Sequence, residues 1–110
     1  MNPQVKEWWL YHLRSGKLEQ TYLQLVKISA FKTHVTYCPL GILCAIYNGV
    51  ISPKKNLWDG EWFLDCCAYL PKEVSDWSGL TIEIQNEITY LGDTKRWSFS
   101  KIANWIEKNL

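Results

Sequence analysis

One cysteine, Cys38, stands where a thiol could act as a nucleophile. It precedes Pro39 and an apolar run that ends at Cys44, a pattern typical of the start of a buried helix. A helix N-terminus lowers the pKa of a thiol, whereas burial among apolar side chains makes it inert. His34, four residues earlier, is the candidate base for a cysteine-dependent hydrolase or transferase. Because the chain has two histidines and the run behind Cys38 is apolar, the sequence favours the inert thiol.

A second group of residues, Arg14, Ser15, Gly16, Lys17 and Gln20, follows the first expected helix. Cations, small donors and an exposed glycine backbone can hold a phosphate or a carboxylate. The spacing is not that of a phosphate-binding loop, Gly-x-x-x-x-Gly-Lys-Ser/Thr. The alternative is a solvated helix end, where the cation of Arg14 offsets the negative end of the helix dipole.

Seven tryptophans in 110 residues are the outlier of the composition. Trp58 and Trp62 bracket a turn-rich loop, in which large apolar rings are not needed for packing. Such rings could stack on a flat ligand or dock on a protein. The alternative is that both rings fold back over the core.

No metal or cofactor site is predicted. The gap between Cys38 and Cys44 is not that of a zinc site, and the adjacent Cys66 and Cys67 cannot point the same way on a strand. We therefore expect four reduced thiols. Six acidic residues of the second half are expected to form a solvated face: Glu61, Asp65, Glu73, Asp76, Glu83 and Glu87.

The elements that must position these residues are predicted from capping residues and apolar periodicity. In the first half they are a helix begun by Asn2 and Pro3 and ended by Gly16, an antiparallel hairpin of Thr21–Ile28 and Thr33–Tyr37 joined by residues 29–32, and a buried helix from Pro39 to Tyr47 closed by Asn48 and Gly49. In the second half they are a strand within Glu61–Tyr69, a short helix within Leu70–Leu80, a helix over 81–91 capped by Gly92, and a last helix capped by Ser98. A strand is the alternative for 81–91, because Thr81 to Ile84 alternates as a strand does.

These elements predict a single α+β domain over residues 1–110. Its order is an N-terminal helix, an antiparallel β-hairpin, a central buried helix, and two or three short C-terminal helices. The net charge of +1, from 12 basic and 11 acidic residues, argues against generic nucleic-acid binding. With no signal-peptide pattern and no long apolar run, we expect a cytoplasmic protein without a membrane segment. Its spare aromatic surface would suit a homo-oligomer.

Four blocks of the sequence resemble a small, largely uncharacterised protein family of bacteriophages and bacteria. They are Leu-Arg-Ser-Gly-Lys, Tyr-Cys-x-Leu-Gly-Ile-Leu-Cys, Leu-Pro-x-x-Val-x-x-Trp-x-Gly-Leu and Ser-Phe-x-x-Ile-Ala, within residues 13–20, 37–47, 70–80 and 91–107. Leu18, Pro39 and Gly92 stand where members typically carry Tyr, a second Cys and Asn-Asp. Because Pro39 replaces that second cysteine, the resemblance gives no support to a mechanism that needs both thiols.

The resemblance implies a small accessory protein that disarms a host defence system. We therefore expect a non-enzymatic binding module that sequesters a small anionic, nucleotide-derived signal. Its expected ligand-binding residues are Arg14, Ser15, Lys17 and Gln20 for phosphate or ribose groups, and Trp58 or Trp62 for a base. The first alternative is an inhibitor that binds a host protein through a Trp-rich patch, and the second is the Cys38 enzyme.

Overall fold

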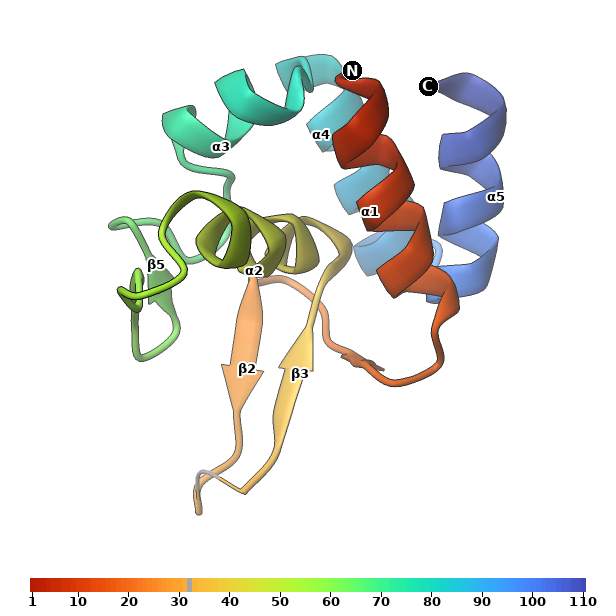
Figure 1. The fold of residues 1–110 in the computed structure, drawn as a ribbon. Helices are drawn as coiled ribbons and strands as arrows, with labels where there is room; N and C mark the ends of the chain where they lie inside the picture. The colour runs from red at the N-terminus through yellow and green to blue at the C-terminus, as the bar shows by residue number, and fades with distance from the viewer. Residues whose placement is uncertain (32) are drawn as a thin grey trace.

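The computed structural model describes residues 1–31 and 33–110; Lys32, in the expected hairpin loop, lies outside the described residues. The fold is α+β, as predicted (Figure 1). Its helices are α1 (Pro3–Arg14), α2 (Pro39–Ile51), α3 (Lys72–Ser78), α4 (Ile82–Thr89) and α5 (Phe99–Asn109), with a π-helix η1 (Tyr90–Thr94) directly after α4. Its strands are β1 (Glu19–Gln20), β2 (Val26–Ile28), β3 (Val35–Tyr37), β4 (Trp58–Asp59) and β5 (Trp62–Phe63).

Helix α2 is the central buried element that the sequence predicts. Its first six residues, Pro39–Cys44, are all buried, and α1, α3 and α4 contact it. The indole N–H of Trp9, which is completely buried, donates a hydrogen bond of 2.9 Å to the carbonyl of Pro39. Because this bond satisfies a polar atom in the middle of the core, it fixes the position of α1 on the start of α2.

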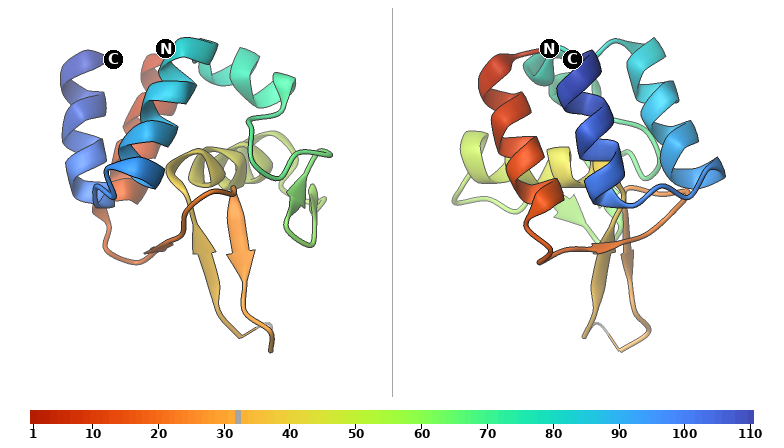
Figure 2. Two further views of the ribbon diagram at one scale, coloured as in Figure 1. Left: turned by 180° about the vertical axis from the view of Figure 1, so that it is seen from behind. Right: turned by 90° about the vertical axis from the view of Figure 1, so that its right-hand side faces the viewer.

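Helices α1 and α5 lie side by side, and the two chain termini lie at the same end of the molecule (Figures 1 and 2). The apolar stripe of α1 contains Val5, Trp9 and Leu13, all buried as predicted. The Ser98 hydroxyl caps α5 by accepting from the backbone N–H of Lys101. Among the described residues, no helix is long and apolar enough to cross a membrane.

The predicted hairpin is present but shorter. Strands β2 and β3 pair antiparallel and project from the helical body (Figure 1). Residues 21–25, expected to be strand, are not, because Leu23 has a left-handed backbone (φ 70°) whose N–H donates to Asp93. A strand that the sequence did not predict, β1, pairs in parallel with β3.

Two helix ends differ from the prediction. Helix α2 continues through Asn48 and Gly49 to Ile51, because the Asn48 side chain bonds Ser52, Lys55 and Leu57 from within the helix. Gly92 is not a left-handed cap: the chain passes through it as the buried part of η1.

The strand expected within Glu61–Tyr69 is also much shorter, since only Trp62 and Phe63 are extended. Leu64 and Asp65 follow with positive φ angles of 47° and 67°, which end the strand. By contrast, the short helix with Pro71 at its start and Gly79 (φ 74°) at its end is confirmed.

Candidate functional site

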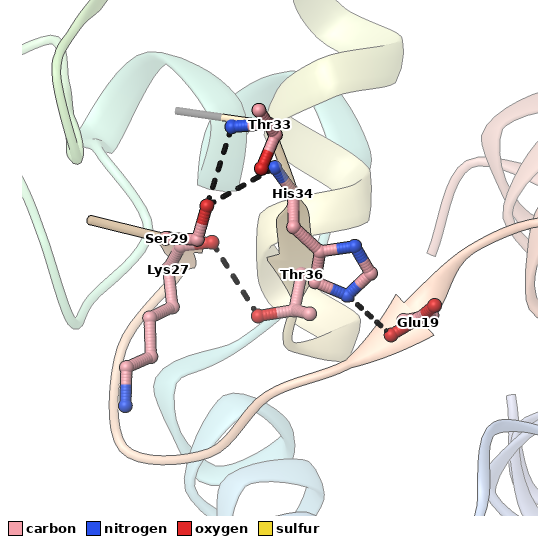
Figure 3. A network of polar contacts seen from close by, with 6 residues as sticks. All are labelled: Glu19, Lys27, Ser29, Thr33, His34 and Thr36. Carbon is pink, nitrogen blue, oxygen red and sulfur yellow. Dashed lines mark hydrogen bonds and ion pairs between the residues drawn. The ribbon is translucent and has the colours of Figure 1, made fainter. Parts of the chain in front are cut away.

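The structure makes Cys38 a capping residue in the core. Its Sγ accepts a hydrogen bond of 3.3 Å from the backbone N–H of Gly41, at the start of α2. Burial is the largest influence on this thiol and raises its pKa from 9.0 to about 12, against the smaller lowering by backbone hydrogen bonds. His34, the candidate base, is exposed and its Nε2 lies 2.6 Å from Glu19 (Figure 3). The geometry therefore gives Cys38 neither a lowered pKa nor a hydrogen-bonded base.

Three of the four polar side chains predicted to bind an anion near the end of α1 form hydrogen bonds within the protein. Arg14 contacts α5, where its Nη1 lies 2.5 Å from Glu107 and its Nη2 donates to Asn104 over 2.9 Å. The hydrogen bond from Arg14 to Glu107 lowers the pKa of the Glu107 carboxyl. The Ser15 hydroxyl donates to the carbonyl of His12 and accepts from the N–H of Lys17.

Gln20 is also engaged, since its amide donates to the carbonyl of Trp97 over 2.8 Å. Of the four polar side chains predicted to hold an anion, only that of Lys17 makes no hydrogen bond or ion pair with the part of the chain that the structure describes. Arg14 instead joins α1 to α5, and Gln20 joins β1 to Trp97, two residues before α5 begins.

The two loop tryptophans behave differently from one another. Trp58 is half-buried, and its ring packs on the core residue Phe63 at a centroid distance of 4.7 Å. Trp62 is 52% exposed on the short strand β5. Trp62 is therefore the more accessible of the two rings. The pairing of Trp58 with Phe63 and of Asp59 with Trp62 places the two tryptophans on opposite faces of the β4–β5 pair, so they do not form a clamp on one ligand.

The strongest combination of aromatic rings and cations lies along α5. A shallow cleft of about 430 Å³, here called the α5 cleft, runs beside this helix. Its lining contains two half-buried tryptophans and two exposed lysines, and it contains no carboxylate. The six lining residues are Trp97, Lys101, Asn104, Trp105, Lys108 and Asn109.

Two lysine side chains lie over the ring of Trp97. The Nζ of Lys101 lies 4.4 Å from the centroid of its ring, and that of Lys95 lies 5.9 Å from it. The neighbouring Arg96 stacks on Tyr22 at 4.0 Å. Cations over exposed rings gain only about 0.5–1 kcal/mol each, so a lysine can leave its ring for a stronger anionic partner.

Two residues that the sequence singled out border this cleft without lining it. Arg14 bonds the side chain of Asn104, and Gln20 bonds the backbone of Trp97. The sequence analysis missed the cleft itself because, among the tryptophans, it singled out Trp58 and Trp62 and not Trp97 or Trp105. The available signal was the spacing of Trp97, Lys101 and Trp105, which repeats every four residues.

A second hollow is an apolar groove of about 400 Å³ between α1, α2 and the end of β3. Its polar side chains are His12 and Tyr37, and the rest of its lining is apolar or glycine. Nothing in its lining attracts an anion as the two lysines of the α5 cleft do. Among the described residues, no group of three or more His, Cys, Asp or Glu could hold a metal ion.

One comparison with known proteins identifies a family. The family model described as a domain of unknown function (DUF8296) matches residues 1–110, so the chain belongs to this family. No curated protein and no solved structure matches the chain.

Proposed function

We propose that this member of the DUF8296 family is a non-enzymatic binding module that sequesters a small anionic, nucleotide-derived ligand in the α5 cleft. The observation that carries the proposal is the lining of the cleft, in which two indoles alternate with two lysines and no carboxylate intervenes. The raised pKa of Cys38 supports binding without catalysis.

The tryptophans and the lysines of the cleft would recognise different parts of the ligand. A base that stacks on an indole contributes about 1–3 kcal/mol, and it does so whichever base is present. Lys101 and Lys108 supply the charge for phosphate, and the Nζ of Lys101 is already held beside Trp97. A ligand that carries both a base and a phosphate can therefore stack on an indole and form an ion pair with a lysine at the same time.

The biological setting of the proposal comes from the resemblance to bacteriophage proteins. A protein that binds a nucleotide-derived immune signal tightly lowers its free concentration, and it needs no catalytic group to do so. We accordingly place the proposed function in phage counter-defence.

The proposal is tested by titration calorimetry with cyclic nucleotides and ADP-ribose-type compounds. We expect at least one of them to bind at micromolar concentration, with affinity that falls as salt is raised. The double substitution Lys101→Gln and Lys108→Gln should weaken that binding at least tenfold, because both phosphate-binding charges are lost.

The matched control is Lys54→Gln with Lys55→Gln, which removes the same net charge from an exposed loop away from α5. This control should bind as the unmodified protein does. The absence of binding to every compound would exclude the proposal, and so would an equal loss in the two double variants.

A second candidate, inhibition of a host protein, is favoured by the exposure of Trp62, because exposed tryptophans are common anchors of protein interfaces. It predicts a host protein that can be identified after capture and that binds again as a purified protein. Trp62→Ala should weaken that binding at least tenfold while the unfolding midpoint stays unchanged. Equal binding by Trp62→Ala and the unmodified protein would rule this candidate out.

A further inference from the structure

Resting on the proposed function, we propose that the ligand of the α5 cleft is a dinucleotide, that is, two nucleosides joined through phosphate, and not a mononucleotide. The cleft presents rings and cations in alternation, and it presents each of them twice. A mononucleotide could use one ring and one lysine and would leave the other pair in water.

The order of these side chains is fixed by helix geometry. Lys101, Trp105 and Lys108 are four and three residues apart within α5, so they share one face of the helix. With a rise of about 1.5 Å per residue, Lys101 and Lys108 start about 10.5 Å apart along the axis. Trp97 extends the row at the other end, because its ring lies under the Nζ of Lys101. Along the cleft the order is therefore ring, cation, ring, cation.

A dinucleotide has the matching order. Its first base would stack on Trp97 and its second on Trp105, while Lys101, between the two rings, would meet the phosphate that joins them. Lys108, beyond Trp105, would meet a further phosphate at the end of the ligand. Each group of the cleft then has one chemical partner.

The two asparagines of the cleft retain hydrogen-bonding groups for such a ligand. Asn104 uses its Oδ1 to accept from Arg14, which leaves its amide N–H groups as donors within the cleft. Asn109 uses its Nδ2 to donate to the carbonyl of Trp105, which leaves its Oδ1 as an acceptor. One donor and one acceptor near the two rings suit the edges and sugars of two nucleosides.

A longer strand fits less well than a dinucleotide. Among the described residues, the lining of the cleft contains two aromatic rings only, those of Trp97 and Trp105. The chain as a whole carries a net charge of only +1, so little charge remains outside the cleft to hold further phosphates.

The test compares three probes by calorimetry at one salt concentration: adenosine monophosphate, the linear 5′-phosphorylated dinucleotide pApA, and a ten-nucleotide oligoadenylate. We expect pApA to bind at least tenfold more tightly than the mononucleotide. We expect the oligoadenylate to exceed pApA only by the number of overlapping sites that it offers. Equal affinities for pApA and the mononucleotide would overturn the dinucleotide inference and leave the proposed function standing. No binding by any nucleotide, cyclic and ADP-ribose-type compounds included, would overturn both.

Variants of the second half of the cleft locate the second base. Trp105→Ala should reduce the preference for pApA to less than threefold, and Trp105→Phe, which keeps a stacking ring, should retain most of it. Since Trp105 is half-buried, the exposed Lys108→Gln provides a variant that does not disturb packing. It should weaken pApA more than the mononucleotide. An unchanged preference for pApA in folded Trp105→Ala, or in Lys108→Gln, would contradict the inference.

Discussion

Replacing Gly41 with alanine is expected to lower the free energy of unfolding by at least about 3 kcal/mol, or to prevent folding. A Cβ at this position would overlap the carbonyl oxygen of Leu25 and would lie 2.7 Å from its carbonyl carbon. The backbone of Leu25 is held on both sides, because its N–H donates to Cys67 and its carbonyl accepts from Cys38. The backbone of Leu25 can therefore not move away to admit a methyl group at Gly41 without breaking these bonds.

The matched control for this substitution lies in the same helix. A Cβ added at Gly49 meets no atom within 4 Å, and the residue is helical. Gly49→Ala should raise the free energy of unfolding by about 0.5–1 kcal/mol, because alanine loses less backbone entropy in a helix. Urea unfolding followed by circular dichroism measures both variants. Similar stabilities for the two would show that α2 does not pack on Leu25 as closely as described.

The contrast between these two glycines marks what the sequence could predict. Helix starts were predicted well, because Asn2, Cys38 and Ser98 each cap a helix through atoms two or three residues away. The sequence predicted that Gly49 would end α2, although this residue lies inside the helix. Gly41 carried no local signal, since the backbone that requires it belongs to Leu25, outside α2.

The strands were harder to predict for the same reason. β1 consists of two polar residues, Glu19 and Gln20, and it exists because the edge of β3 is available to it. Similarly, the left-handed turn at Leu23 depends on Asp93, which lies seventy residues away in the sequence. Pairings of this kind are set by the folded chain and leave no pattern in a short window of sequence.

The candidate site, too, could be predicted only in part from the sequence. The sequence identified Arg14 as a cation at a helix end, but its acceptors, Asn104 and Glu107, lie in the last helix. The alternation of Trp97, Lys101 and Trp105 was visible in the sequence. It became a candidate binding surface only when the fold placed these residues along one cleft.

The thiol of Cys38 is expected to be almost unreactive in the folded protein. Raising its pKa from 9.0 to about 12 lowers the thiolate fraction at pH 8 about a thousandfold, because each pH unit changes the ratio tenfold. Iodoacetamide should therefore modify Cys38 at least about a thousand times more slowly in the folded protein than in the chain unfolded by guanidinium. Mass spectrometry of the peptide that contains Cys38 measures both rates, and the half-buried Cys67 provides an internal comparison.

The burial of Cys38 also determines the direction in which the free energy of unfolding changes at alkaline pH. Above pH 9 the unfolded chain releases the proton of Cys38, whereas the folded chain keeps it up to a pH of about 12. The free energy of unfolding should therefore fall as the pH rises through this interval, because deprotonation favours the unfolded state.

Rapid alkylation of Cys38 in the folded protein at pH 7 would contradict the burial of this thiol, since it requires an exposed thiolate. That result would favour the cysteine-dependent enzyme, which the sequence analysis gave as the second alternative. Slow alkylation is the result expected of Cys38 as the buried cap of α2.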